Sequence, residues 1–208
     1  RKLVGASYSR DMTELQWGPK EVSPVLRAEF SYEFDKPFNR AVATTMFGAK
    51  EEGTAALIVD PSRGVAERDQ VSFMIGADYF LWLPFWETQD TSVFTSVQLF
   101  TIVTPNGEDL LFQAPYAAYG AKLHQVQNYG TLLLSHTFDD GKLPVELLAV
   151  YDIQNQAVAL RQRFDFNYFG DNIRPRIEIA HFEADPEQGV LGFAQQSDNV
   201  EFSLTLQF

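Results

Sequence analysis

The stretch Val200-Glu201-Phe202-Ser203-Leu204-Thr205-Leu206-Gln207-Phe208 alternates apolar and polar residues and ends on an aromatic side chain. Successive side chains of a β-strand point to opposite faces, so the pattern predicts a strand with one apolar and one polar face. Alternation alone does not say which face meets water and which meets protein or lipid. The terminal Phe208 favours lipid, because the ends of soluble domains usually fray into polar tails.

Bacterial outer-membrane barrels characteristically end on such a strand, and its terminal aromatic is part of the signal read by the barrel assembly machinery. We therefore expect Phe202, Leu204, Leu206 and Phe208 to form this assembly signal. The expected fold is all-β, an antiparallel transmembrane β-barrel in the bacterial outer membrane. Outer-membrane lipid and the assembly machinery are then its first expected partners.

The composition argues against several other classes of protein. The chain has no cysteine, which excludes disulfides, thiolate metal sites and a cysteine nucleophile. Its net charge of -12 argues against a nucleic-acid partner, because phosphate binding needs a basic surface. The longest apolar run, Tyr79 to Trp86, is far shorter than the roughly 18 residues of a transmembrane helix. The 18 Phe and 8 Tyr suit aromatic girdles, although a β-sandwich core is also rich in aromatic residues.

About nine segments alternate as strands, each near the ~9 to 11 residues of a tilted membrane strand. Six of them alternate clearly: 26–34, 71–83, 143–151, 158–168, 173–179 and 200–208. Three alternate less clearly: Leu3 to Ser9, Thr91 to Val103 and Tyr129 to Phe138.

The connections fall into two groups when strands are counted back from Phe208, which we place in the periplasm. Compact turns at 84–90, 139–142 and 169–172 share its side. Long connections at 35–67, 105–128 and 184–197, with a tight turn near 153–156, lie on the opposite, extracellular side. This asymmetry is typical of outer-membrane barrels and has no reason to occur in a sandwich. The count also places Trp82, Phe85 and Trp86 at the periplasmic end, as an interface aromatic belt.

An odd number of strands would bring Arg1 in from the extracellular side, whereas bacterial single-chain barrels have even strand numbers. We therefore expect residues 1–208 to be the carboxyl-terminal portion of a larger barrel, with no second domain or internal repeat.

Three stretches carry a family resemblance: Val25 to Asn39, Arg68 to Trp82 and Phe94 to Phe100. They resemble the carboxyl-terminal half of the proteobacterial outer-membrane family catalogued as domain of unknown function thirteen-oh-two. The resemblance implies a barrel encoded near RND-type inner-membrane transporters and a periplasmic or lipoprotein partner. It also implies export or uptake of lipid-like or other hydrophobic compounds. Members of that family are considerably longer, and they offer no catalytic residues to carry over.

Charged residues on the polar faces of the strands are the candidate site, because they would line the lumen if the apolar faces meet lipid. The predicted lumen-lining residues are Arg27, Glu29, Glu33, Asp78, Glu146, Arg161, Arg163, Asp165, Arg174, Arg176, Glu178 and Glu201. The four arginines from 161 to 176 lie on two strands joined by a short turn, so they predict a basic patch. One interpretation is a selectivity strip for anionic solutes or lipid headgroups. The other is a cross-strand ion-pair ladder with Glu146, Asp165 and Glu178.

Catalysis and metal binding have little support in the sequence. His124, His136 and His181 fall on different segments without metal-ligand spacing. Ser135 beside His136 points to the opposite face of its strand. We therefore expect no enzyme activity, no metal and no cofactor.

The long connection at 35–67 contains two apolar stretches, at 41–47 and 54–59. It predicts either a gate folded into the mouth or an extracellular hairpin that extends the wall, and 107–125 allows the same two interpretations.

The function expected is an outer-membrane channel, or the outer-membrane component of a trans-envelope transport system, for lipid-like or amphipathic compounds. A soluble β-sandwich or lipocalin-like binding module is the rival class, since its strands alternate in the same way. A third hypothesis is a plugged structural barrel that scaffolds a periplasmic partner.

Overall fold

The computed structural model describes residues 2–16, 21–40, 65–82, 92–107, 110–111, 124–170, 172–185, 191, 194 and 197–207. In chain order its elements are β1 (Lys2–Asp11), η1 (Thr13–Leu15), β2 (Val25–Arg40), β3 (Val65–Trp82), β4 (Ser92–Val103), β5 (Leu110–Leu111), β6 (Val126–Phe138), β7 (Leu143–Asp152), β8 (Ala157–Asp165), β9 (Ile173–Glu183) and β10 (Asn199–Leu206). The helix η1 is one short 3-10 turn. No helix in the described part of the chain is long and apolar enough to cross a membrane.

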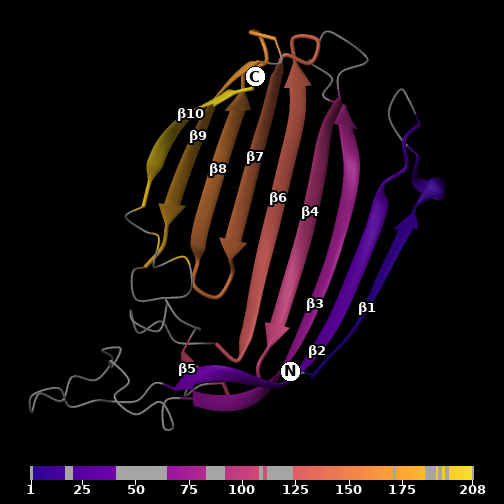
Figure 1. The fold of residues 1–208 in the computed structure, drawn as a ribbon. Coiled ribbons are helices and arrows are strands. Elements are labelled where there is room, and N and C mark those ends of the chain that lie inside the picture. The colour runs from indigo at the N-terminus through magenta and orange to yellow at the C-terminus, as the bar shows by residue number, and fades with distance from the viewer. Residues whose placement is uncertain are drawn as a thin grey trace, which may run out of the picture.

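The described strands form one antiparallel sheet in the order β1-β2-β3-β4-β6-β7-β8-β9-β10, and the two-residue β5 pairs with β2 off this path. Figure 1 shows the sheet as a curved wall with β1 and β10 at its opposite edges. The predicted all-β antiparallel fold is confirmed, and the nine predicted segments correspond to the nine strands of this path. Among the described residues the sheet does not close, because β1 pairs only with β2 and β10 only with β9.

The sheet has two ends, named here by their place in Figure 1. The upper end carries the turn at 139–142, the connection at 166–172 and the carboxyl terminus; the lower end carries the start of β1, the turn at 153–156 and the connection from β9 to β10. The turn at 139–142 is tight because Asp139, Asp140 and Gly141 all have positive φ, with values of 51°, 51° and 92°. Asp and Gly tolerate that backbone region best, which explains why the sequence signalled a turn here.

The predicted connection at 35–67 is wrong at both ends, because β2 continues to Arg40 and β3 begins at Val65. The cause is a β-bulge. Glu33 pairs with Gln70 and Lys36 with Arg68, so Phe34 and Asp35 both lie opposite Asp69. Asp35 has a φ of 49°, and its backbone N–H donates to Asp69 Oδ1 at 3.1 Å. An extra residue reverses the alternation beyond it, so the strand's sequence pattern ended at Phe34.

Beyond the bulge, β2 and β3 turn and run across the lower end of the sheet (Figure 1). Leu110 and Leu111 of β5 pair there with Arg40 and Asn39 of β2, inside the predicted connection at 105–128. Residues 36–40 and 65–67 of the first connection and Leu110 and Leu111 of the second thus extend the wall as paired strand. The apolar stretches at 41–47 and 54–59, on which the gate prediction depends, lie outside the described residues.

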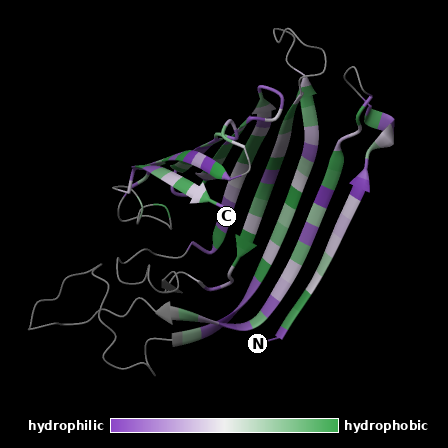
Figure 2. Cartoon of the chain, turned by 45° about the horizontal axis from the view of Figure 1, so that its top comes forward, coloured by the Kyte–Doolittle hydropathy of each residue, from purple (hydrophilic) through white to green (hydrophobic). Residues whose placement is uncertain are grey.

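The strand register separates the sheet into an apolar and a polar face. One row of paired residues crosses β2, β3, β4, β6, β7 and β8 and is apolar throughout: Leu26, Ala77, Val97, Leu132, Ala149 and Leu160. Figure 2 shows the alternation as bands of contrasting hydropathy along the strands. On the apolar face of the described strands, Asp, Glu, Lys and Arg occur only near strand ends, at Lys2, Arg10 and Glu183, or at and beyond the bulge, at Asp69 and Glu67.

The two faces differ in exposure in the direction opposite to that of a water-soluble sheet. Ile75, Val97 and Phe202 on the apolar face are 60%, 44% and 67% exposed. Gln70, Ser96 and Gln127 on the polar face are buried, whereas on the apolar face of the described strands only Val93 and Thr95, near the start of β4, are buried. Curvature crowds side chains on the inner side of a sheet and spreads them on the outer side. The polar face is therefore the inner face of the curve.

Candidate functional site

The strand register brings all of the predicted charged residues to the polar face. Arg27, Glu29 and Glu33 lie on β2 and Asp78 on β3. Glu146, Arg161, Arg163 and Asp165 lie on β7 and β8, and Arg174, Arg176, Glu178 and Glu201 on β9 and β10. They do not form one cluster. β4 and β6 separate the group on β2 and β3 from the group on β7 to β10.

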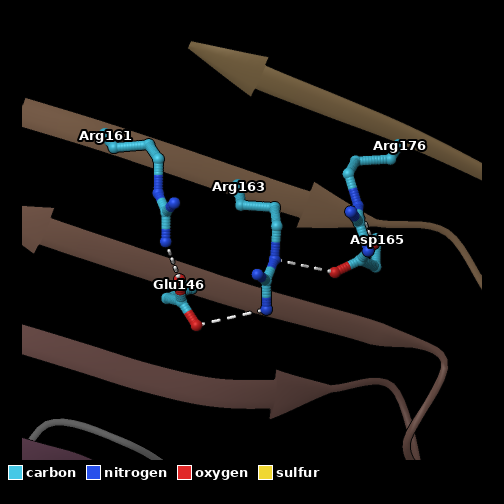
Figure 3. A network of polar contacts seen from close by, with 5 residues as sticks. All are labelled: Glu146, Arg161, Arg163, Asp165 and Arg176. Carbon is cyan, nitrogen blue, oxygen red and sulfur yellow. Dashed lines mark hydrogen bonds and ion pairs between the residues drawn. The ribbon is translucent and has the colours of Figure 1, made fainter. Parts of the chain in front are cut away.

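The larger group contains a continuous chain of ion pairs, drawn in Figure 3. Glu146 accepts from Arg161 Nη2 at 2.8 Å and from Arg163 Nη2 at 3.1 Å. Asp165 lies 3.1 Å from Arg163 Nε and 2.6 Å from Arg176 Nε. This is the geometry expected of the ladder interpretation: each carboxylate lies between two guanidinium groups.

Strand pairing explains why these five side chains meet. Glu146 is directly opposite Arg163, Arg161 is the diagonal neighbour two residues away, and Asp165 is directly opposite Arg176. Side chains at i and i+2 of one strand share a face, which places Arg161, Arg163 and Asp165 in a row on β8. The carboxylates of Glu146 and Asp165 are 18% and 19% exposed, while Arg161 and Arg176 are 40% and 47% exposed. Water therefore still screens the guanidinium ends.

The smaller group lies on β2 and β3. Arg27 donates to Asp78 at 2.8 Å near the upper end, and Lys36 lies 2.9 Å from Glu33 beside the bulge. Lys36 also donates to Gln70, whose amide donates to Thr104 at 3.1 Å. Sequence reasoning missed Lys36 because the bulge returns it to the polar face. Alternation without a break would have placed it on the apolar face.

Two of the predicted residues form an acidic pair. Glu178 on β9 lies directly opposite Glu201 on β10. Like charges at directly opposed positions destabilise a sheet. Of the two predicted interpretations of this region, the ladder accounts for Glu146 and Asp165 through direct ion pairs, whereas Glu178 lies opposite both Arg163 and Glu201.

An open depression of about 560 Å³ lies on β1 to β4 and was missed by sequence reasoning. Its lining combines small residues with apolar ones and one carboxylate, and includes Gly5, Ser7, Glu29, Ser72, Met74 and Ile102. The signal that could have found it is the run of small residues Gly5, Ser7 and Ser9 on the polar face of β1, with Ser31 and Ser72 paired across from Gly5 on β2 and β3.

The register places Trp82 on the polar face, opposite Ser92, rather than on the face that a membrane belt would need. Its ring packs with Phe80 at 6.4 Å between centroids, and Phe80 packs with Phe94 at 5.7 Å. Phe85 and Trp86 lie outside the described residues. Trp82 thus belongs to an aromatic cluster on the inner face at the upper end.

The predicted assembly-signal residues Phe202, Leu204 and Leu206 share the apolar face of β10 and are 67%, 51% and 50% exposed. Phe208 lies outside the described residues. An exposed apolar edge strand is a surface that another protein can recognise and pair with.

The three histidines have separate partners. His136 Nδ1 lies 2.7 Å from the carbonyl of Ser92, His124 Nε2 lies 3.0 Å from Asn155, and His181 Nδ1 lies 2.6 Å from Asp198. In the described residues, no group of three or more histidine and carboxylate side chains is placed to hold a metal ion.

Hydrogen bonds shift the pKa of two groups in the connections. The backbone N–H of Phe182 and then the side chain of His181 lower the pKa of Asp198, between β9 and β10. A hydrogen bond to Asp139 raises the pKa of Tyr168, which ties the turn at 139–142 to the connection from β8 to β9. Both groups stabilise connections between strands.

Comparisons with protein-family models, curated proteins and solved structures found no match for this chain.

Proposed function

We propose that this chain forms part of the wall of an outer-membrane β-barrel whose apolar face contacts lipid and whose polar face lines a water-filled lumen. The barrel acts as a channel, or as the outer-membrane component of a transport system, for amphipathic compounds. The observation that carries the proposal is the exposed apolar face. It runs across the strands of the sheet with its charges near strand ends or by the bulge.

An apolar surface of this extent is not stable in water. Soluble proteins rarely expose apolar patches larger than a few hundred Å². On β3 the apolar residues run from Val71 to Leu81, which at about 3.4 Å per residue spans roughly 34 Å of strand. A tilt of about 40° reduces this to about 26 Å, close to the ~25 Å apolar band of outer-membrane barrels. The band therefore fits the hydrocarbon core of a bilayer.

The rival soluble folds fit these contacts less well. A β-sandwich covers its apolar face with a second sheet, whereas all described strands belong to one sheet. A lipocalin-like module turns its apolar face inward, whereas here the polar face has the crowded, buried side chains. Both comparisons support lipid as the medium outside the wall.

The directions of the edge strands constrain how the barrel closes. Every neighbouring pair along the path is antiparallel, so β1 and β10 run in the same direction. An all-antiparallel closure then requires an odd number of further strands between them, from this protein or from another copy. Such a total agrees with the even strand numbers of bacterial barrels.

The character of the inner face supports amphipathic solutes. The depression on β1 to β4 presents Ser7 and Ser72 beside Met74 and Ile102, whereas β7 to β9 present paired charges. A molecule with an apolar body and a polar head would find both surfaces on one wall. The proposal extends to membership of the domain-of-unknown-function family thirteen-oh-two, with a periplasmic or lipoprotein partner and an RND-type transporter.

Gel mobility and conductance together test this proposal. The full-length protein in outer-membrane detergent extracts should migrate faster unheated than boiled, since a closed barrel resists denaturation by detergent. Purified protein should then conduct ions across a planar bilayer. Identical migration with solubility free of detergent would contradict the barrel. A mobility shift without conductance would favour the structural scaffold over the channel.

A further inference from the structure

A second, polar pocket of about 400 Å³ lies at the upper end of β8, β9 and β10 on the inner face. The residues that give it its chemistry are Arg163, Asp165, Asn167, Arg174, Arg176 and Thr205. Three guanidinium groups thus line a space that holds a single carboxylate. Arginines thus outnumber carboxylates in the lining itself, while Glu146 contacts Arg163 and Glu178 lies opposite Arg163 just outside the pocket.

Each carboxylate oxygen of the ladder already has a guanidinium contact. The four oxygens of Glu146 and Asp165 contact four guanidinium nitrogens of Arg161, Arg163 and Arg176. A guanidinium has more N–H donors than these contacts use. Arg176 engages Asp165 through Nε, and its side chain is 47% exposed. Its terminal nitrogens can therefore take part in a second contact.

We propose that this pocket binds the oxyanion head, a carboxylate or phosphate, of the amphipathic compound that the barrel transports. The proposal rests on the proposed function, because it assigns a headgroup site inside that lumen. A planar guanidinium matches a carboxylate or phosphate with two parallel N–H bonds, and two such groups converge here on β9. The ladder holds Arg163 and Asp165 in place, so binding requires little reordering of the wall.

Location adds a second argument. The overall negative charge of the chain repels anions at long range, so an anion gains from this wall only where positive charge is local. Arg163, Arg174 and Arg176 supply that charge at the end of the lumen where β10 finishes. A headgroup held there would leave its apolar body free to lie along the inner face.

The test uses full-length protein in a neutral detergent, titrated calorimetrically with hexyl phosphate, inorganic phosphate and hexyl glucoside. Hexyl phosphate should bind saturably, and hexyl glucoside should not. Substituting Arg174→Gln and Arg176→Gln together should weaken hexyl phosphate binding about tenfold or more, since two charge-assisted contacts are lost. The matched control, Arg27→Gln, removes an arginine from the same face but outside the pocket and should leave the affinity within about twofold.

The phosphate arm separates the sources of the oxyanion. Tighter binding of hexyl phosphate than of inorganic phosphate supports a headgroup site. Equal binding of both contradicts it and indicates a site for free anions. Binding that the double substitution does not change would overturn the proposal.

Heat modifiability is measured on the same samples. If the unheated band is shifted but no anion binds, the barrel stands and the headgroup site is contradicted. If the protein binds anions but is soluble without detergent and shows no shift, the barrel is contradicted. If the double variant shows no heat shift, it has not folded, and the wild-type protein provides the test. Its affinity for hexyl phosphate should fall steeply as the salt concentration rises, and an affinity independent of salt would contradict the pocket.

Discussion

The two faces of this sheet differ in which side chains they expose and in how their charges are placed. On the polar face, Glu146 and Asp165 lie between arginines from the same or neighbouring strands, so these charges on the inner side of the curve have opposite charges beside them. On the apolar face, Ile75 and Phe202 are more than half exposed, and the charged residues lie near strand ends or by the bulge. The comparison teaches that the two faces suit different media: the proposed barrel would place lipid against the apolar face and water against the polar one.

The largest expected effect comes from a charge placed in the middle of the apolar face. Leu99→Lys on β4 should abolish membrane assembly or cost about 2–4 kcal/mol of unfolding free energy, since a cation near the bilayer centre is poorly solvated. Gln98→Lys is the matched control, because its side chain lies on the polar face of the same strand. The measurement is the fraction of heat-modifiable protein in membranes. Equal fractions for the two variants would show that the faces are equivalent.

A smaller effect is expected within the ladder. Glu146→Gln leaves Arg161 and Arg163 without their shared carboxylate and should lower the unfolding free energy by about 1 kcal/mol, a value kept small by the partial exposure of these groups. Urea unfolding of lipid-reconstituted protein measures it. Glu201→Gln is the control: it relieves the opposed Glu178 and should raise stability by about 0.3 kcal/mol. A loss as large as that of Glu146→Gln would argue against the assigned pairing.

The smallest effect is a pH dependence at the lower end of the sheet. Asp198 has a lowered pKa, so the folded state favours its carboxylate. The stabilisation is complete above the ordinary carboxyl pKa and is lost as the pH falls through the lower, folded value. The amide resonance of Phe182, which donates to Asp198, should shift in that range. Asp198→Asn should remove this transition, and a transition that persists in the variant would assign it to another group.

Alternation of apolar and polar residues predicted the strands and their two faces, because successive side chains of a strand point to opposite faces. It failed at Asp35, where one extra residue in the bulge reverses the faces and returned Lys36 to the inside. It was also weak at Leu132 to Leu134, where Leu133 lies on the polar face within an apolar run.

The sequence predicted which residues belong to the candidate site but not which of them contact each other. Residues at alternate positions of a strand share a face, so the sequence predicted which charged residues form the ladder. Which of them meet depends on register. Glu146 lies opposite Arg163, whereas Glu178 has Arg163 opposite it on β8 and Glu201 opposite it on β10. The pattern within one strand does not contain this information. Trp82 shows the same limit: its position near a strand end was predicted, but the membrane-belt role needs the opposite face.

The central claim is that lipid covers the apolar face and water the polar one, and spin labels on neighbouring residues of β4 test it most directly. Residues 1–208 contain no cysteine, so Val97→Cys, Gln98→Cys, Leu99→Cys and Phe100→Cys each give one labelling site within them, and any cysteine elsewhere in the full-length protein is first replaced by serine. In reconstituted full-length protein we predict that labels at 97 and 99 collide with oxygen dissolved in the bilayer. Labels at 98 and 100 should instead collide with a water-soluble nickel chelate. Uniform access to the chelate at all four sites, or shielding of 97 and 99 from both reagents, would contradict the account.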